Sequence, residues 1–125
     1  MKTIIETDKA PRALGPYSQA VEYKGMIYTS GQIAIDPATG KMVDGDFAAR
    51  VHQVMHNLAA VLEAGGSDFT KVIKSTIFVT DLSKFAVLNE IYGAYVSASK
   101  PARATVQVAA LPLGTDVEIE MIAHK

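Results

Sequence analysis

Hydrophobic and polar residues recur with two different periodicities along this chain, and the first is typical of β-strands. Residues 19–35 contain two runs of apolar and hydroxyl side chains that meet at Lys24-Gly25, where glycine can supply the positive φ of a tight turn. This pattern predicts a β-hairpin. Residues 36–40 (DPATG) collect turn-forming side chains, and a polar loop is expected from there to Asp46.

After this loop, the periodicity changes to that of an α-helix. Asp46 is suited to cap the start of this helix, and Gly65-Gly66 to end it. Apolar residues recur at spacings of three and four and define one stripe: Phe47, Val51, Val54, Leu58 and Val61. Residues 71–79 (KVIKSTIFV) are rich in β-branched side chains, which is typical of a buried strand.

A second helix is predicted after Asp81, which is another candidate N-cap, and Pro101 prevents this helix from continuing. Its apolar stripe consists of Phe85, Leu88, Tyr92 and Tyr95. Two strands then complete the chain. Apolar side chains occupy even positions in residues 103–110 and odd positions in residues 117–123, as expected of half-buried strands.

The predicted order is two strands, a helix, a strand, a helix and two strands, with a further short strand at residues 3–6. It indicates one α+β domain over residues 1–125, with both helices on one face of a mixed sheet. If the helices cover the apolar positions of the closing strands, the polar positions face away from them: Arg103, Thr105, Gln107, Glu118 and Glu120. The hairpin adds apolar Met26 and Tyr28 to one of its faces, so we expect association through the uncovered face.

Composition excludes several classes of function. Twelve basic and thirteen acidic residues leave a net charge of -1, without the concentrated positive field that a nucleic-acid partner requires. The absence of cysteine excludes disulfides, thiolate nucleophiles and zinc sites built on sulfur. No stretch is apolar enough to span a bilayer, and the scattered charges of residues 1–17 do not resemble a signal peptide. We expect a cytoplasmic protein without nucleic-acid or membrane partners.

Charged residues of the two closing strands are the first candidates for chemistry. The planar guanidinium of Arg103 can grip a substrate carboxylate, although an ordinary salt bridge is the alternative. Glu120 can hold and activate a water molecule as a general base, and Glu118 shares its apparent face and its chemistry. The structural alternative for these residues is an ion pair between Arg103 and Glu120.

Three further motifs are less specific. Residues 29–32 (TSGQ) combine a hydroxyl, an amide and a glycine that lets the backbone approach a ligand, but they also fit a strand end with a bulge. Residues 15–18 (GPYS) form a turn that presents an aromatic ring. His52 and His56 have a permissible metal spacing, but without the glutamate of an HExxH motif we interpret them as solvated. No metal or cofactor site is predicted.

Four segments together resemble the RidA/YjgF family: GPYSQA at 15–20, TSGQI at 29–33, PARATVQVAALP at 101–112 and VEIEMIA at 117–123. The similarity extends over essentially the whole chain. It implies a homotrimer of subunits that resemble one type of chorismate mutase, with sheets inward, helices outward and a cleft between each pair of subunits. Members of the family hydrolyse reactive enamines and imines, such as 2-aminoacrylate (2-iminopropanoate) and 2-iminobutanoate, to 2-oxo acids and ammonia without a cofactor.

The resemblance also implies roles for individual residues. Arg103 matches the arginine that binds the substrate carboxylate, and Glu120 matches the carboxylate that positions the hydrolytic water. Positions that line or adjoin the cleft match Tyr17, Ser30, Gly31, Asn89 and Tyr92. The chain departs from many relatives at Thr105, where they carry cysteine.

Two other functions stay open at this point. One is a trimer that binds a small 2-oxo acid or amino acid without turnover, in which Arg103 would serve and Glu120 would be expendable. The other is a protein-interaction or chaperone-like role; translation inhibition and ribonuclease activity are also claimed within the family. The near-neutral charge disfavours the versions that involve nucleic acid.

Overall fold

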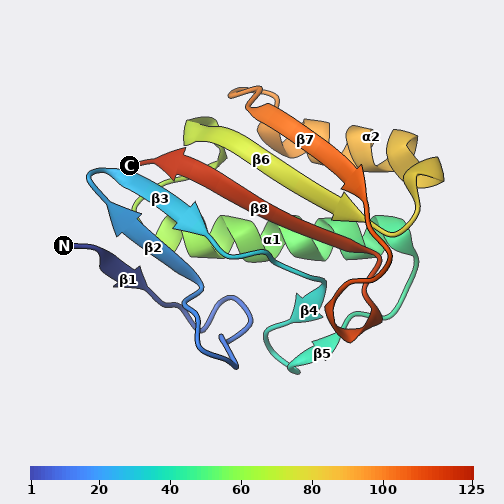
Figure 1. Ribbon diagram of the computed structural model, residues 1–125, viewed down its shortest axis with the longest axis horizontal. Helices are drawn as coiled ribbons and strands as arrows, with labels where there is room; N and C mark the ends of the chain where they lie inside the picture. The colour runs from blue at the N-terminus through green and yellow to red at the C-terminus, as the bar shows by residue number, and fades with distance from the viewer.

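A computed structural model describes residues 1–125 as a six-stranded sheet with two α-helices on one of its faces. The strands pair in the order β1-β2-β3-β8-β6-β7. The helices α1 (Phe47–Ala64) and α2 (Phe85–Val96) lie behind the sheet in Figure 1, so the viewer looks onto the face that they leave uncovered. The predicted α+β class, with both helices on one face, is confirmed.

The N-terminal part of the sheet is antiparallel. β1 (Thr3–Ile5), β2 (Ala20–Tyr23) and β3 (Met26–Thr29) follow one another at this side. Lys24 and Gly25 join β2 to β3 with φ values of 51° and 80°, as a two-residue turn with positive φ at both positions requires. The predicted hairpin and the short first strand are therefore confirmed, although β3 ends before Ser30.

Two very short strands flank the turn at residues 36–40. β4 (Ile35–Asp36) pairs with β5 (Lys41–Met42) outside the main sheet. Asp36 Oδ1 accepts a hydrogen bond of 2.9 Å from the Ala38 N–H, which fixes the turn. The sequence indicated the turn correctly but not this small pairing.

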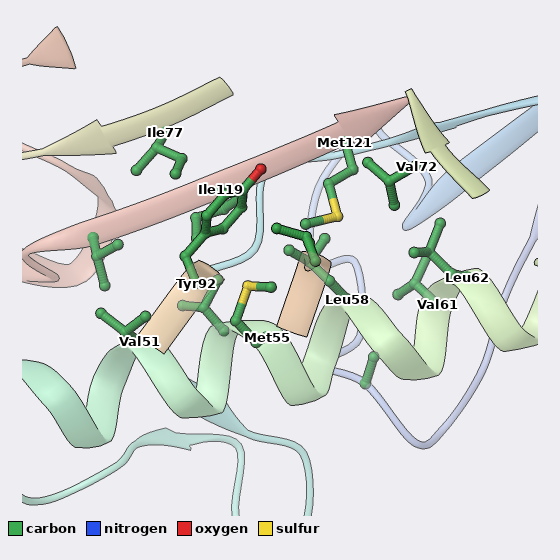
Figure 2. Close-up of a cluster of buried hydrophobic side chains, with 14 of the residues drawn as sticks. Val51, Met55, Leu58, Val61, Leu62, Val72, Ile77, Tyr92, Ile119 and Met121 are labelled. Carbon is green, nitrogen blue, oxygen red and sulfur yellow. The ribbon is translucent and has the colours of Figure 1, made fainter. Parts of the chain in front are cut away.

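The first helix begins and ends where its caps predict. Asp46 Oδ1 accepts a hydrogen bond of 2.9 Å from the Ala49 N–H, and Gly65 is the C-cap. The predicted stripe is buried, and it packs with Met55 and Leu62 against the sheet. Figure 2 shows five of them directed from α1 toward the sheet residues Ile77, Ile119 and Met121: Val51, Met55, Leu58, Val61 and Leu62. Burying one such side chain stabilises the fold by about 1.5–3 kcal/mol.

The middle of the chain forms a β-α-β crossover. β6 (Val72–Val79) is preceded by a 3₁₀ turn, η1 (Phe69–Lys71), and followed by another, η2 (Leu82–Lys84). Asp81 caps η2 by accepting a hydrogen bond of 2.9 Å from the Ser83 N–H. After α2, the chain returns as β7 (Ala102–Gln107), parallel to β6 at the edge of the sheet.

The last strand lies in the centre of the sheet. A 3₁₀ turn, η3 (Pro112–Gly114), leads into β8 (Val117–His124), which pairs with both β3 and β6. The predicted alternation is confirmed, because four side chains are at most 1% exposed: Val117, Ile119, Met121 and Ala123.

The prediction for β7 was wrong about which of its sides faces the helices. In register with β6, Arg103 pairs with Ser75 and Thr105 with Ile77, and Ser75 and Ile77 are fully buried beneath the helices. In-register neighbours point to the same face of a sheet, so Arg103 and Thr105 also lie on the helix side. At an edge strand the helix layer is incomplete, which lets a polar side chain reach solvent there. The apolar side of β7 therefore lies on the uncovered face, where Val106 is 42% exposed.

The uncovered face carries more apolar surface than a solvated sheet needs. The register places Ile4, Val21 and Tyr28 on it at one side and Val106 at the other. Ile4 is 56% exposed and Tyr28 is 43% exposed. Such a face is typical of a surface that associates with another chain. Neither helix combines the length and the apolarity that crossing a bilayer requires.

Candidate active site

Arg103 is held at the sheet edge by three side chains of α2. Its Nη1 donates a hydrogen bond of 2.7 Å to Asn89 Oδ1. Its guanidinium carbon lies 5.3 Å from the ring centroid of Phe85 and 5.4 Å from that of Tyr92. Aromatic faces attract a cation without neutralising its charge. The structure thus brings together three of the predicted site residues, Arg103, Asn89 and Tyr92, and adds Phe85.

Arg103 has no carboxylate partner in its own chain. The three ion pairs of the chain join Arg50 and Lys84 to Asp116, and Lys125 to Glu22. The intramolecular pair of Arg103 with Glu120 that the sequence left open is contradicted, because Glu120 lies on the opposite face of the sheet. The remaining donors of the guanidinium are therefore available to a ligand.

The depression beside Arg103 is electrostatically suited to an anion. It has a volume of about 450 Å³, and its lining includes Lys100 and Arg103 but no acidic side chain. Lys100 lies where the chain leaves α2, with φ at 42°. Two cations without a nearby carboxylate favour a small negatively charged ligand at this edge.

Beneath Arg103, the Tyr92 ring is fixed by a buried serine. Tyr92 is 5% exposed, and its hydroxyl donates a hydrogen bond of 2.8 Å to Ser75 Oγ. Burial raises the pKa of Tyr92, although Ser75 and the charge of Arg103 act in the opposite direction. The phenol therefore stays neutral at physiological pH. Sequence reasoning missed Ser75, whose only signal was a small polar residue within an apolar strand.

The other predicted residues gather on a different part of the subunit. Tyr17 is 56% exposed and lines a groove of about 660 Å³ together with Ser30. Ser30 Oγ donates a hydrogen bond of 2.6 Å to the Ser18 carbonyl, so this hydroxyl holds the 15–18 turn in place. Buried Gln19 ties down the preceding loop, because its Nε2 donates to the carbonyls of Thr7, Ala10 and Pro11. The sequence gave no sign of this role.

A carboxylate lies directly against Gly31. A Cβ at position 31 would overlap the carboxyl group of Glu118, so glycine leaves room for this side chain in its present position. Burial raises the pKa of Glu118, and the charge of nearby Glu120 raises it further. A partly desolvated carboxylate of this kind is better suited to accept a proton near neutral pH than a fully solvated one.

Glu120 occupies a neighbouring position on the same uncovered face. It pairs in register with Thr76 and lines a small hollow of about 270 Å³ with Tyr28 and Lys74. Of the two carboxylates that the sequence left as candidates, Glu118 lies against Gly31 of the TSGQ segment, whereas Glu120 lines its hollow together with Thr29. The catalytic role expected for Glu120 from the resemblance stays a prediction.

One subunit thus contains two separate groups of candidate residues. The arginine group, defined as Arg103, Asn89, Tyr92 and Phe85, lies on the helix side at the β7 edge. The carboxylate group, defined as Tyr17, Ser30, Gly31 and Glu118, lies near the ends of β3 and β8, with Glu118 on the uncovered face. No three His, Cys, Asp or Glu side chains come together as a metal-binding cluster.

The sheet, its helix layer and the two groups of candidate residues together define a class of protein. This is a small α+β protein that is suited to binding an anionic molecule at the edge of its sheet. Residues 7–125 match the family model described as Endoribonuclease L-PSP, which represents the YjgF/RidA family. The chain belongs to this family. The resemblance drawn from the sequence motifs is therefore confirmed.

Known proteins of this family are similar over nearly their full length. Protein DfrA of Myxococcus xanthus is 56% identical over 121 residues, which cover 95% of this chain and 92% of that protein. The mouse 2-iminobutanoate/2-iminopropanoate deaminase is 48% identical over 123 residues, covering 98% and 91%. The crystal structure of RidA from the Antarctic bacterium Psychrobacter sp. PAMC 21119 is 50% identical, with a TM-score of 0.94 and coverage of 98% and 99%. The family thus includes proteins named as imine deaminases.

Proposed function

We propose that this protein hydrolyses small enamines and imines that carry a carboxylate, such as 2-aminoacrylate (2-iminopropanoate) and 2-iminobutanoate, to 2-oxo acids and ammonia. The proposal depends mainly on the environment of Arg103: its guanidinium is stacked on two aromatic rings and has no carboxylate partner in its own chain. Relatives named as deaminases of these compounds support the choice of substrate. Because such imines arise in amino-acid metabolism, the cytoplasmic location expected from the sequence is part of this proposal.

Arg103 binds and orients the substrate in this mechanism. Its planar fork takes the carboxylate in a bidentate grip, while Asn89 fixes the guanidinium from the side. Lys100 adds a second positive charge at the same depression. The reacting carbon is attached directly to the carboxylate, so anchoring one end of so small a molecule also positions the imine for attack.

The hydrolysis needs only water and proton transfer. A protonated imine carbon is electrophilic, and water adds to it to form a carbinolamine. The C–N bond then breaks, ammonia departs, and the hydroxyl proton is lost as the C=O bond forms. Glu118 accepts the proton of the attacking water and returns it to the leaving nitrogen. No cofactor or metal takes part in the proposed reaction.

The two groups of residues complete one another between subunits. We place the arginine group of one subunit against the carboxylate group of its neighbour in a homotrimer, with the uncovered sheet faces packed inward. The exposed apolar side chains of that face support this assembly. The position of Arg103 and Glu118 on opposite faces of one sheet supports a shared cleft, because a single subunit does not join them.

The proposal is tested by supplying imine from a threonine or serine dehydratase and following 2-oxo acid formation. We expect purified protein to accelerate that formation, Arg103→Ala to abolish the acceleration, and the exposed-charge control Lys41→Ala to retain it. A folded wild-type protein that binds a 2-oxo acid but gives no acceleration would contradict the proposal and support the binding trimer.

The description of the family model names a ribonuclease activity, and the same purified protein can be tested for it. RNA would be cut and imine hydrolysis would be absent. The net charge of -1 argues against that function.

A further inference from the structure

Two histidines and a tyrosine meet on the outer surface of the helix layer. His52 and His56 lie one turn apart on α1, and both side chains are exposed. The Tyr95 hydroxyl of α2 lies 2.7 Å from His52 Nδ1 and 3.2 Å from His56 Nε2. The histidines are exposed as the sequence predicted, but both are engaged by the same oxygen atom.

We propose that His52 and His56 bind one divalent transition-metal ion of the Zn²⁺, Cu²⁺ or Ni²⁺ class, with Tyr95 beside it. One nitrogen of each imidazole points at the Tyr95 hydroxyl oxygen, because the i and i+4 spacing places the two histidines on the same helix face. An ion bound to both nitrogens replaces these two hydrogen bonds and displaces the hydroxyl to the side. Metal–nitrogen bonds of about 2.0–2.1 Å require the rings to close in slightly, which exposed side chains can do by rotation.

The nature of the donors selects the class of ion. Neutral imidazole nitrogens suit zinc, copper and nickel, whereas calcium and magnesium require several oxygen ligands. No three His, Cys, Asp or Glu side chains gather here, so water and the phenol oxygen complete an open coordination sphere. Burial raises the pKa of Tyr95, which keeps its hydroxyl protonated in the metal-free protein.

The pair is held in position before any ion arrives. The Tyr95 ring packs edge-on against Phe69, with 5.8 Å between ring centroids, and its hydroxyl in turn orients both imidazoles. The centroids of the two imidazoles are 6.4 Å apart. Because the site lies on the helix layer, it does not depend on the proposed catalytic cleft.

Binding is tested by calorimetric titration of Zn²⁺, and separately of Cu²⁺ and Ni²⁺, into the full chain after removal of any affinity tag. We expect saturable binding of one ion per chain for at least one of these metals. The affinity should fall at least about tenfold in His52→Ala and in His56→Ala, each of which removes one of the two nitrogens. The matched control is His124→Ala, since His124 is the third histidine and bonds only its neighbour's carbonyl.

A second readout does not depend on heat of binding. Saturating metal should raise the Tm of the wild type and of His124→Ala, but not that of His56→Ala, because an ion bound only to the folded state stabilises it. The proposal is overturned if no metal gives saturable binding, or if binding is the same in wild type and both helix-histidine variants.

Discussion

At the residue scale, the decisive feature is a guanidinium whose partners are neutral. Asn89, Phe85 and Tyr92 hold Arg103 in place without cancelling its charge. Lysine at this position would keep the charge but lose the planar fork and the stacking. We therefore expect Arg103→Lys to lower kcat/KM about tenfold to 100-fold, corresponding to one lost charge-assisted hydrogen bond. Steady-state kinetics in the dehydratase-coupled assay measure this, and an unchanged kcat/KM would show that the fork is not used.

The two glutamates of β8 give a pH-dependent prediction. Glu118 acts as a base only when ionised, so kcat/KM should fall as the pH drops through its pKa, which burial and the charge of Glu120 hold above the ordinary value. Glu120→Gln removes the like charge and should move this acid limb to lower pH while leaving turnover in place. Glu118→Gln should remove most of the turnover at every pH.

The reverse result distinguishes the two assignments. If Glu120→Gln removes turnover and Glu118→Gln keeps it, then the water is positioned by Glu120, as the family resemblance implied. The matched pair of substitutions keeps size and shape in both cases, so the comparison reports on the loss of the carboxylate's charge and basicity at each position.

At the element scale, one ion pair joins the first turn of α1 to the start of β8. Arg50 Nε and Nη2 donate hydrogen bonds of 2.7 Å to Asp116 Oδ1 and Oδ2. The hydrogen bonds from Arg50 hold the pKa of Asp116 below its ordinary value. A lowered pKa means that the folded state gains stability above the ordinary pKa of an aspartate and loses it as the pH falls through the lowered value.

We expect Asp116→Asn to lower the free energy of unfolding at pH 7 by about 1–3 kcal/mol, the usual range for a charged hydrogen bond that is partly shielded from water. The difference from wild type should shrink in acid, where Asp116 is protonated in both states. Urea unfolding followed by circular dichroism at several pH values measures it. A difference that is constant with pH would mean that the charge of Asp116 contributes nothing.

Local patterns in the sequence predicted both helices, the caps of α1 and the hairpin, because these depend on residues a few positions apart. The cap of α2 was predicted wrongly, because Asp81 caps the short turn η2 and α2 begins after Lys84 without a side-chain cap. Asp46, Gly65 and Lys24-Gly25 all act as the sequence indicated. The orientation of β7 was not predictable in this way. The register of β7 with β6 decides which of its alternate side chains face the helices. The apolar side chains of β7 lie on the uncovered face, and the sequence pattern of a single strand does not show which face the helices cover.

The candidate site was predicted only in part, because local motifs are visible in the sequence and contacts between distant segments are not. The motifs around Arg103 and Gly31 are local and were visible in the sequence. Ser75 and the contact of Glu118 with Gly31 depend on strand pairing between distant segments, so only the structure distinguishes Glu118 from Glu120. The division of the site between two faces likewise follows from the arrangement of the strands.

At the scale of the whole molecule, the uncovered face should drive assembly. Val106 on this face and Val87 on α2 are each 42% exposed, so they form a matched pair. We expect Val106→Lys to give folded monomers without imine hydrolysis, because it places a charge where apolar surface is buried between subunits. Val87→Lys should remain trimeric and active. Size-exclusion chromatography with light scattering would contradict this if both variants assembled alike.

The central claim is that each active site takes its arginine from one subunit and its carboxylate from the next. Co-expression of Arg103→Ala and Glu118→Gln subunits carrying different tags yields mixed trimers that can be purified by both tags. Whether a mixed trimer contains two subunits of one kind or of the other, about one third of its clefts (one of the three) contain both functional residues. We predict that these mixed trimers recover imine hydrolysis while each parent trimer stays inactive. Folded mixed trimers that remain as inactive as their parents would contradict the shared site.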